Sequence, residues 1–228
     1  MYKRQIQHNK ILKRREFLSG VTAIWALTLG SSASQTQALS GDISTPAQTE
    51  GPFYPVKKPI DQDADLTLIG NNSARAAGDL LLVQGRILMP NGSPVTNAMV
   101  EIWQTNAWGR YQDRRDRSDA PWDPNFQGYG HVTTSDDGLY AFRTIRPVGY
   151  GKGYFRRTPH IHFRITGRHF DRLTTQMYFA GEPENANDGP LNRVSDSAAR
   201  KRLIVDPQPV NGQGTQLGIF DIVLGRNL

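Results

Sequence analysis

The chain has 228 residues and no cysteine, and its 27 basic and 21 acidic side chains give a formal net charge of +6. The length fits one domain or two small ones. Without cysteine, a disulfide scaffold, a Cys-based zinc site and an iron–sulfur cluster are excluded. Residues 1–38 hold +5 of the net charge, and the rest of the chain carries only +1. The basic balance is therefore no argument for nucleic-acid binding.

The N-terminal residues are typical of an export signal. The basic stretch Lys13–Leu18 precedes an apolar run centred on Val21–Leu29, and small residues follow at 31–34. This is the layout of a secretory signal, and the run is too short to span about 30 Å of hydrocarbon. Two arginines followed one residue later by Phe-Leu resemble a twin-arginine signal. We expect residues 1–38 to direct residues 39–228 through the export machinery to the periplasm or the exterior, with no stable membrane span; the alternative is an ordinary amphipathic helix.

Short apolar runs separated by Gly, Pro, Asn and Asp predict an all-β domain over residues 39–228. The expected strands are Leu80–Leu88, Ala98–Gln104, Tyr140–Ile145, His160–Thr166, Thr174–Phe179 and Ile219–Leu224. Strong turn signals lie at 90–93 and 136–138. A helical pattern is expected at Ser195–Leu203. Many short strands with few helices favour a two-sheet β-sandwich with long loops and at most one or two short helices.

A pair of histidines, His160 and His162, is the first candidate for chemistry. In a strand, side chains at i and i+2 point to the same face, about 6–7 Å apart at Cα, and two imidazoles so placed can bind one metal ion. A His-x-His pair alone is more often a surface or structural pair. No carboxylate stands at a recognisable spacing from the pair, which disfavours a zinc hydrolase.

Tyrosines surround this pair in the sequence, with Tyr150 and Tyr154 upstream and Tyr111 farther back. A phenolate is a hard, anionic oxygen donor that suits a trivalent ion such as Fe(III). Metal binding lowers a tyrosine pKa from about 10, so that the phenolate forms at neutral pH. Each tyrosine alone is more often a core residue than a ligand, and Tyr154 competes with Tyr150 for such a role.

Six sequence blocks occur along the chain in a specific order. They are Thr49–Tyr54, Val100–Tyr111, Asp123–Phe126, Asp137–Pro147, Arg157–Phe163 and Leu173–Gln176. Together they resemble the intradiol ring-cleavage dioxygenases, the family of protocatechuate 3,4-dioxygenase and catechol 1,2-dioxygenase. The resemblance implies a bound Fe(III), a small aromatic diol and O2 as substrates, and insertion of both oxygen atoms between the two hydroxyl-bearing carbons. The expected product is a cis,cis-muconate-type diacid.

The resemblance also implies roles for individual residues. The metal ligands would be Tyr111, Tyr150, His160 and His162. Tyr150 would be the ligand that leaves the iron when the catechol dianion binds, and it would help to accept a substrate proton. Arg157 would stabilise negative charge that develops on the substrate, with Gln176 near it. Trp103 and Tyr154 are expected in the substrate pocket.

Two details bear on the substrate and on the assembly. Tyr150-Gly151 resembles the catechol type, whereas Asp123–Phe126 resembles the protocatechuate type, and the chain has no room for a long N-terminal dimerisation domain. We therefore expect a protocatechuate-type enzyme, and exposed sheet edges are compatible with a homo-oligomer. The alternative is a non-catalytic, transthyretin-like accessory or binding sandwich, which segments 85–100 and 136–140 also resemble. The set of four ligands separates the two hypotheses.

Overall fold

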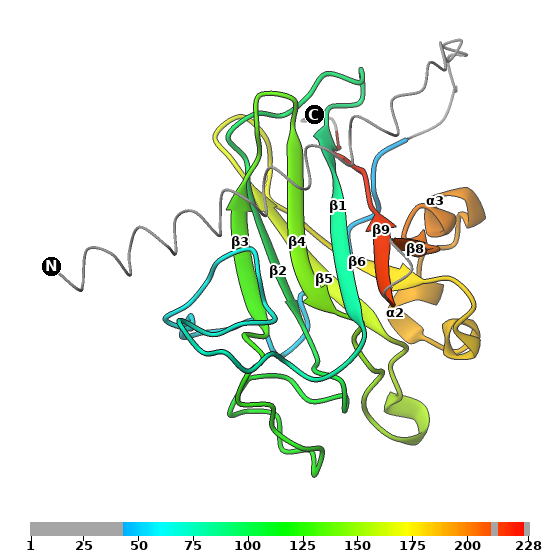
Figure 1. The fold of residues 1–228 in the computed structure, drawn as a ribbon. Coiled ribbons are helices and arrows are strands. Elements are labelled where there is room, and N and C mark those ends of the chain that lie inside the picture. The colour runs from blue at the N-terminus through cyan, green and yellow to red at the C-terminus, as the bar shows by residue number, and fades with distance from the viewer. Residues whose placement is uncertain (1–42, 211–213, 226–228) are drawn as a thin grey trace, which may run out of the picture. The chain divides into compact units, whose positions relative to one another are not determined.

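Two five-stranded sheets form the domain in the computed structural model, which describes residues 43–210 and 214–225 (Figure 1). The first sheet contains β1 (Leu80–Leu88), β4 (Leu139–Ile145), β8 (Gln208–Val210), β9 (Thr215–Ile219) and β10 (Ile222–Val223). The second has the order β3 (Tyr129–Thr133), β2 (Met99–Gln104), β5 (His160–Thr166), β6 (Leu173–Phe179) and β7 (Ile204–Val205). The predicted all-β sandwich is confirmed.

Short helices occupy the connections between strands. Single turns of 3-10 helix lie at η1 (Gly153–Phe155) and η2 (Pro183–Ala186), and the α-helices are α2 (Gly189–Asn192) and α3 (Ser197–Lys201). Within the described residues no helix is long and apolar enough to cross a membrane. The export signal predicted for residues 1–38 lies outside the described residues, so it stays a prediction.

The predicted strand Ile219–Leu224 is in fact two strands, because a side chain takes one hydrogen-bonding position along the edge of β1. Both β9 and β10 pair with β1 in parallel, but Phe220 and Asp221 between them do not continue the ladder. The N–H of Phe220 donates to the carbonyl of Gln84 (2.8 Å), and the carboxylate of Asp221 accepts from the N–H of Arg86 (2.8 Å). An apolar run shows only that the segment is buried, so the break could not be predicted.

One helix and one strand also differ from the sequence-based expectation. The helix expected at Ser195–Leu203 is shorter, because the side chain of Asp196 accepts a hydrogen bond from the N–H of Ala198 and caps α3 there. Strand β3 was not predicted, since its sequence Tyr-Gly-His-Val-Thr has no apolar run. It forms because it pairs with β2 along its whole length.

The main core lies between the two sheets and covers only one face of β5. Ile161, Phe163 and Ile165 of β5 are buried in this core together with Leu81 and Val83 of β1. Because side chains alternate along a strand, the even-numbered residues of β5 face outward, where loops cover them. A second, smaller cluster of buried aromatic side chains lies on that side of the sheet.

Replacing Gly85 with Ala is expected to lower the free energy of unfolding by about 3 kcal/mol, at the upper end of the usual cost of overpacking. A side chain at this position of β1 would overlap the carbonyl group of Phe220, between β9 and β10. The hydroxyl of Tyr140 donates to the same carbonyl, so this carbonyl has little freedom to shift. Urea denaturation measures the change. The control is Gly189→Ala, whose added carbon has no atom within 4 Å; equal stabilities of the two variants would contradict the prediction.

Candidate metal centre

The pairing of strands gathers the predicted site residues on the outer face of the second sheet. His162 on β5 lies opposite Trp103 on β2 and opposite Gln176 on β6. His160 lies opposite Tyr178, also on β6. Residues directly opposite each other across a ladder share one face of the sheet. These five side chains therefore form two adjacent rows, and the predicted convergence of the two histidines is realised in β5.

Three donor atoms from two parts of the chain meet at this point. Nε2 of His160 lies 3.2 Å from Nε2 of His162. The hydroxyl oxygen of Tyr111 lies 3.4 Å from the first nitrogen and 3.1 Å from the second. Ligand atoms that each lie about 2.1 Å from one ion, and subtend about 90–110°, are about 3.0–3.4 Å apart. The three atoms are therefore spaced as the ligands of a single metal ion.

The hydrogen bond made by the His160 ring leaves a nitrogen lone pair in this triangle of atoms. Nδ1 of His160 lies 2.7 Å from the carbonyl oxygen of Thr158, so the ring proton belongs there and Nε2 presents a lone pair. The phenol of Tyr111 has a single hydrogen, although two imidazole nitrogens are within its reach. One proton cannot satisfy both, whereas one cation at the centre would bind all three donor atoms. The residues present thus fit a metal ion.

Burial keeps these groups neutral when no cation is bound. It lowers the pKa of both His160 and His162, and the positive charge of Arg157 acts in the same direction. It also raises the pKa of Tyr111 well above its ordinary value. Neutral imidazole is the form that binds metals, and a bound ion would lower the phenol pKa and yield phenolate. Among the described residues no three His, Cys, Asp or Glu side chains are grouped so that they could hold a metal ion.

A tight loop after β2 brings Tyr111 to the histidines. The side-chain oxygen of Asn106 accepts hydrogen bonds from two backbone N–H groups of the loop, at 2.9 and 3.0 Å. Gly109 has a φ of +80°, and a side chain there would lie 2.7 Å from the carbonyl oxygen of Gly149. Only glycine adopts this conformation so close to another backbone without strain. The Asn and Gly of this sequence block therefore serve to place the tyrosine.

Tyr150 lies beside Tyr111 and His160. Its ring is edge-on to that of Tyr111 at 5.2 Å between centroids, and 5.8 Å from the ring of His160. Its backbone pairs with Arg157 in an antiparallel bridge. Burial raises the pKa of Tyr150, while the charge of Arg157 opposes that increase. Tyr150 is half-buried, whereas the other three candidate ligands are buried.

Aromatic rings cover the candidate ligands and limit their rotation. The ring of Trp103 is completely buried and stacks parallel on His162, with centroids 4.7 Å apart and an interplanar angle of 6°. Phe53 stacks on Tyr111 at 4.6 Å. Gly51 lies so close to His162 that a side chain there would come within 3.4 Å of the imidazole. These contacts fix the planes of two ligand rings and exclude water from one side of them.

A charged network joins Arg157, which precedes β5, to Gln176 on β6. Nε of Arg157 donates to Oδ2 of Asp188 at 2.7 Å, and an Nη donates to Oε1 of Gln176 at 2.7 Å. The amide nitrogen of Gln176 donates in turn to the carbonyl of Thr49 at 2.7 Å. Burial alone would lower the pKa of Arg157, but the hydrogen bond to Asp188 and its charge raise it. The guanidinium is therefore a fixed positive charge beside the donor set.

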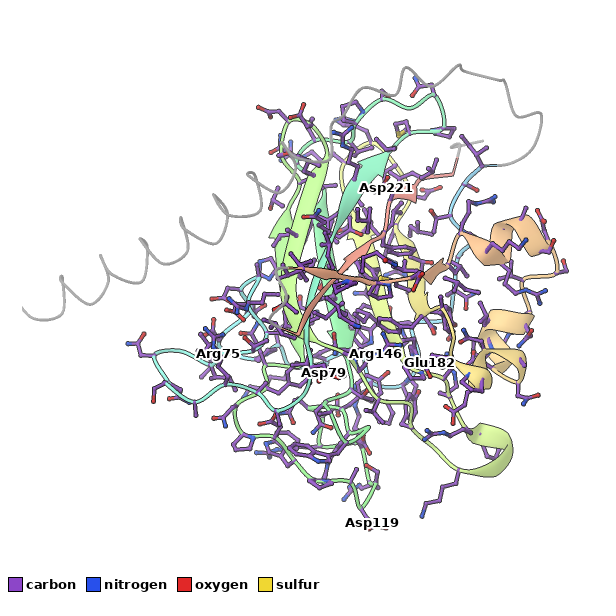
Figure 2. All side chains as sticks on the ribbon, turned by 45° about the vertical axis from the view of Figure 1, so that its right-hand side comes forward. Arg75, Asp79, Asp119, Arg146, Glu182 and Asp221 are labelled. Carbon is purple, nitrogen blue, oxygen red and sulfur yellow. The ribbon has the colours of Figure 1, made fainter. Side chains whose placement is uncertain are left out.

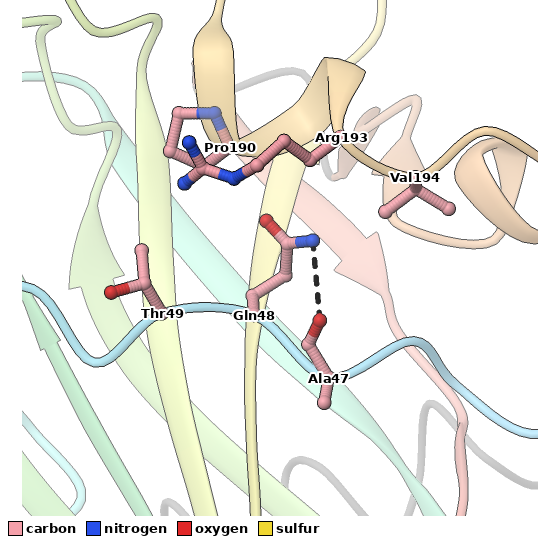
Figure 3. A pocket seen from close by; sticks show the side chains of 6 residues that line it. All are labelled: Ala47, Gln48, Thr49, Pro190, Arg193 and Val194. Atoms are coloured by element: carbon pink, nitrogen blue, oxygen red, sulfur yellow. Dashed lines mark hydrogen bonds between the residues drawn. The ribbon is translucent and has the colours of Figure 1, made fainter.

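A groove of about 260 Å³ is connected to this network (Figure 3). Its lining residues are Ala47, Gln48, Thr49, Pro190, Arg193 and Val194. The side-chain oxygen of Gln48 accepts a hydrogen bond from the hydroxyl of Tyr178 at 3.0 Å, and Thr49 binds Gln176 as described. Figure 3 shows the guanidinium of Arg193 extending over Gln48 and Thr49. The groove thus places a cation close to the residues that hold Arg157.

A second groove, of about 530 Å³, is lined among others by Gly149 and has two arginines, both engaged in ion pairs. Arg146 binds Glu182 at 2.7 Å, and both are labelled in Figure 2. Arg156 binds Glu184 at 2.8 Å. Because these charges neutralise each other, this groove offers less to a charged ligand than the first.

Most of the predicted site residues are close together in space. They are Tyr111, Tyr150, His160, His162, Arg157, Gln176 and Trp103. The backbone of Tyr154 lies in η1, and its side chain is outside the described part of the structure. Sequence reasoning missed Phe53 and Asp188 as neighbours of the site. The order Asp-Gly-Pro at 188–190 is a helix N-cap signal that could have drawn attention to Asp188.

The chain matches one protein family over most of its length. The family model named Dioxygenase matches residues 49–225. The chain is 44% identical over 172 residues to the protocatechuate 3,4-dioxygenase beta chain of Burkholderia cepacia, covering 72% of this chain and 73% of that one. Catechol 1,2-dioxygenase 2 of Acinetobacter lwoffii is 32% identical over 153 residues, and the match spans about half (52%) of that relative.

Solved structures agree with this assignment. The dioxygenase domain of a dioxygenase and carbohydrate-binding fusion from Streptomyces sp. SirexAA-E has a TM-score of 0.59 and 29% identity, covering 79% of this chain and 97% of that domain. 3-Chlorocatechol 1,2-dioxygenase from Rhodococcus opacus, at 19% identity and a TM-score of 0.64, has the same fold. The chain belongs to the intradiol ring-cleavage dioxygenases.

Proposed function

We propose that this chain is an Fe(III)-dependent intradiol dioxygenase that cleaves a protocatechuate-like catechol. The observation that supports the proposal most strongly is the convergence of Nε2 of His160, Nε2 of His162 and the hydroxyl of Tyr111 within 3.1–3.4 Å of one another. Tyr150 would complete the ligand set. Two phenolates and two neutral imidazoles give a hard, anionic donor set, which suits a trivalent ion better than the softer divalent metals.

The overall reaction adds both atoms of O2 to the diol and releases nothing, so catechol and O2 yield a muconate-type diacid of the summed composition. A ferric ion, when bound, would make the chelated catecholate ring reactive towards O2. The residues of the chain bind the diol, take up its protons and stabilise charge on the ring. The accessory-sandwich alternative gives no reason for a buried set of convergent donors of this kind.

Tyr150 would be the ligand that exchanges with the substrate. It is the least buried of the four candidate ligands, and its ring contacts both Tyr111 and His160. As the diol binds, the phenolate oxygen of Tyr150 would accept one hydroxyl proton, since the buried phenol has a raised pKa once it is free. Arg157, with its guanidinium fixed by Asp188 and Gln176, would lie beside the ring and stabilise negative charge there.

Protocatechuate is favoured as the substrate for two reasons. The 44% identity to a protocatechuate 3,4-dioxygenase beta chain exceeds the 32% identity to a catechol 1,2-dioxygenase. A ring carboxylate also requires a cation, and Arg193 lies in the groove that Gln48 and Thr49 connect to the site. An exposed guanidinium can attract a carboxylate without a large desolvation cost.

Changing Arg193 to Gln is expected to raise KM for protocatechuate about 1.4- to fivefold and to leave KM for catechol unchanged. The size follows from the roughly 0.2–1 kcal/mol that an exposed ion pair contributes. Steady-state oxygen uptake with both substrates measures the change. Arg168→Gln, which removes another exposed charge, serves as the control. A parallel rise in KM for both substrates would show that Arg193 does not recognise the carboxylate.

The visible absorption spectrum of the iron-loaded protein tests the proposal directly. A tyrosinate-to-iron band, shifted when protocatechuate is added without oxygen, is the expected result. Admission of labelled O2 should then give a ring-opened product with two new carboxyl groups that together contain both labelled oxygen atoms. A protein that stays colourless after reconstitution with iron would reject the metal centre, and a coloured protein that leaves catechols intact would reject the reaction.

A further inference from the structure

We infer that Asp188 is a positioning residue that holds the guanidinium of Arg157 at the substrate and the imidazole of His160 at the metal. The inference rests on the proposed function and adds a residue that the sequence did not single out. Asp188 lies 28 residues after His160 and outside the β-strands, directly before α2. Its side chain is completely buried.

The carboxylate of Asp188 is surrounded by donors. Oδ2 accepts from Nε of Arg157 at 2.7 Å and from the backbone N–H of Thr158 at 3.1 Å. Oδ1 accepts from the N–H of Leu191 at 3.0 Å. A buried carboxylate is stable only when its lone pairs are satisfied in this way. The geometry binds two consecutive residues, 157 and 158, to one rigid anion.

Each of these two residues leads to a different part of the site. The guanidinium of Arg157 donates from Nε to Asp188 and from Nη2 to the side-chain oxygen of Gln176, so it is held from two sides. The carbonyl of Thr158 accepts from Nδ1 of His160 at 2.7 Å, which keeps the proton on that nitrogen and leaves Nε2 for the metal. Asp188 therefore acts on the substrate side through a side chain and on the metal side through the backbone.

A simpler role for Asp188 is that of a helix cap, and the chain contains a matched example. Asp196 caps α3 through one hydrogen bond to the N–H of Ala198, but it is exposed and contacts no site residue. The Asp196→Asn variant therefore measures the effect of the same Asp-to-Asn change at a helix cap away from the site. Asp188→Ser keeps an oxygen that can cap the N–H of Leu191, and it removes the charge and the second oxygen, which bind Arg157 and the N–H of Thr158.

The test is a double-mutant cycle on the iron-loaded protein with protocatechuate. Asp188→Asn is expected to lower kcat at least tenfold. The amide can turn only a neutral oxygen to Nε of Arg157, or it turns its NH2 group, which cannot accept a hydrogen bond from Nε. Asp188→Ser, the variant that keeps the cap, should show the same loss if Asp188→Asn does not fold. In the Arg157→Ala background, either change should lower kcat per bound iron less than twofold further, since the partner through which Asp188 acts on the substrate is already absent. Asp196→Asn should behave as the wild type.

Two measurements besides turnover complete the test. Anaerobic titration should show protocatechuate bound at least fivefold more weakly by Asp188→Asn, and its iron content should fall when it competes with a chelator for the metal. Full kcat in Asp188→Ser, or losses that simply multiply in the double variant, would overturn the inference. A wild-type protein that neither binds nor cleaves the diol would instead reject the proposed function, so the two failures are distinguishable.

Discussion

Replacing Tyr111 with Phe is expected to lower iron affinity more than about 100-fold and to abolish turnover. Even residues that only orient a metal ligand cost 10–100-fold in affinity when they are removed. The hydroxyl of Tyr111 would itself be a donor atom, and it lies within 3.4 Å of both imidazole nitrogens. The ring stays in place in the variant, because its stacking on Phe53 does not involve the hydroxyl. Loss of iron would therefore report the missing oxygen and not a collapsed site.

Tyr129→Phe is the matched control for this prediction. Tyr129 is a buried tyrosine of the same aromatic cluster, and its hydroxyl donates to Glu101 at 2.6 Å and not to the histidines. The iron content, measured by plasma emission, and the visible band should be unchanged in this variant. Tyr111→Phe protein that retains its iron, its colour and its turnover would show that the oxygen is not a ligand.

Replacing Arg157 with Ala is expected to lower kcat/KM more than tenfold while the iron is retained. A tenfold loss corresponds to about 1.4 kcal/mol in the barrier. The guanidinium is held by Asp188 and Gln176 and is only 12% exposed, so water cannot easily replace its charge. Stabilisation of a developing negative charge is stronger in such a dry, fixed setting than in water. Stopped-flow kinetics with protocatechuate would separate binding of the diol from its reaction with oxygen.

The adjacent Arg156 offers a control at nearly the same place in the chain. Its guanidinium pairs with Glu184 and is 39% exposed, and it does not contact the donor set. Arg156→Ala should keep kcat/KM within twofold of the wild-type value. If Arg157→Ala loses its iron as well as its activity, the residue supports the metal site structurally, and the proposed electrostatic role is wrong.

The strands that carry the site were predictable because their patterns are local. The limits predicted for β1 and β5, Leu80–Leu88 and His160–Thr166, agree with the structure. The same period-two alternation that makes β5 a strand also places His160 and His162 on one face. The break at Phe220 and the strand β3 were not predictable, since both depend on pairing with distant residues.

Some contacts between site residues that are far apart in the chain could be predicted only from the resemblance, and others could not be predicted at all. Tyr111 lies 49 positions before His160, and nothing in either local pattern says that their side chains meet. The resemblance to the dioxygenases selected Tyr111 and Arg157 by their sequence blocks. It selected neither Phe53 as the ring stacked on Tyr111 nor Asp188 as the partner of Arg157.

The sequence by itself determined that this is an all-β chain with a His-x-His strand and the blocks of the intradiol dioxygenase family, because alternation, turn residues and motif order are properties of neighbouring positions. Only the tertiary structure decided which atoms converge. The register of β5 against β2 and β6 sets Trp103 and Gln176 beside His162, and two loops bring Tyr111 and Asp188 to the same place. Those distances depend on how whole sheets pack and on the loops that cross them, which no local pattern encodes.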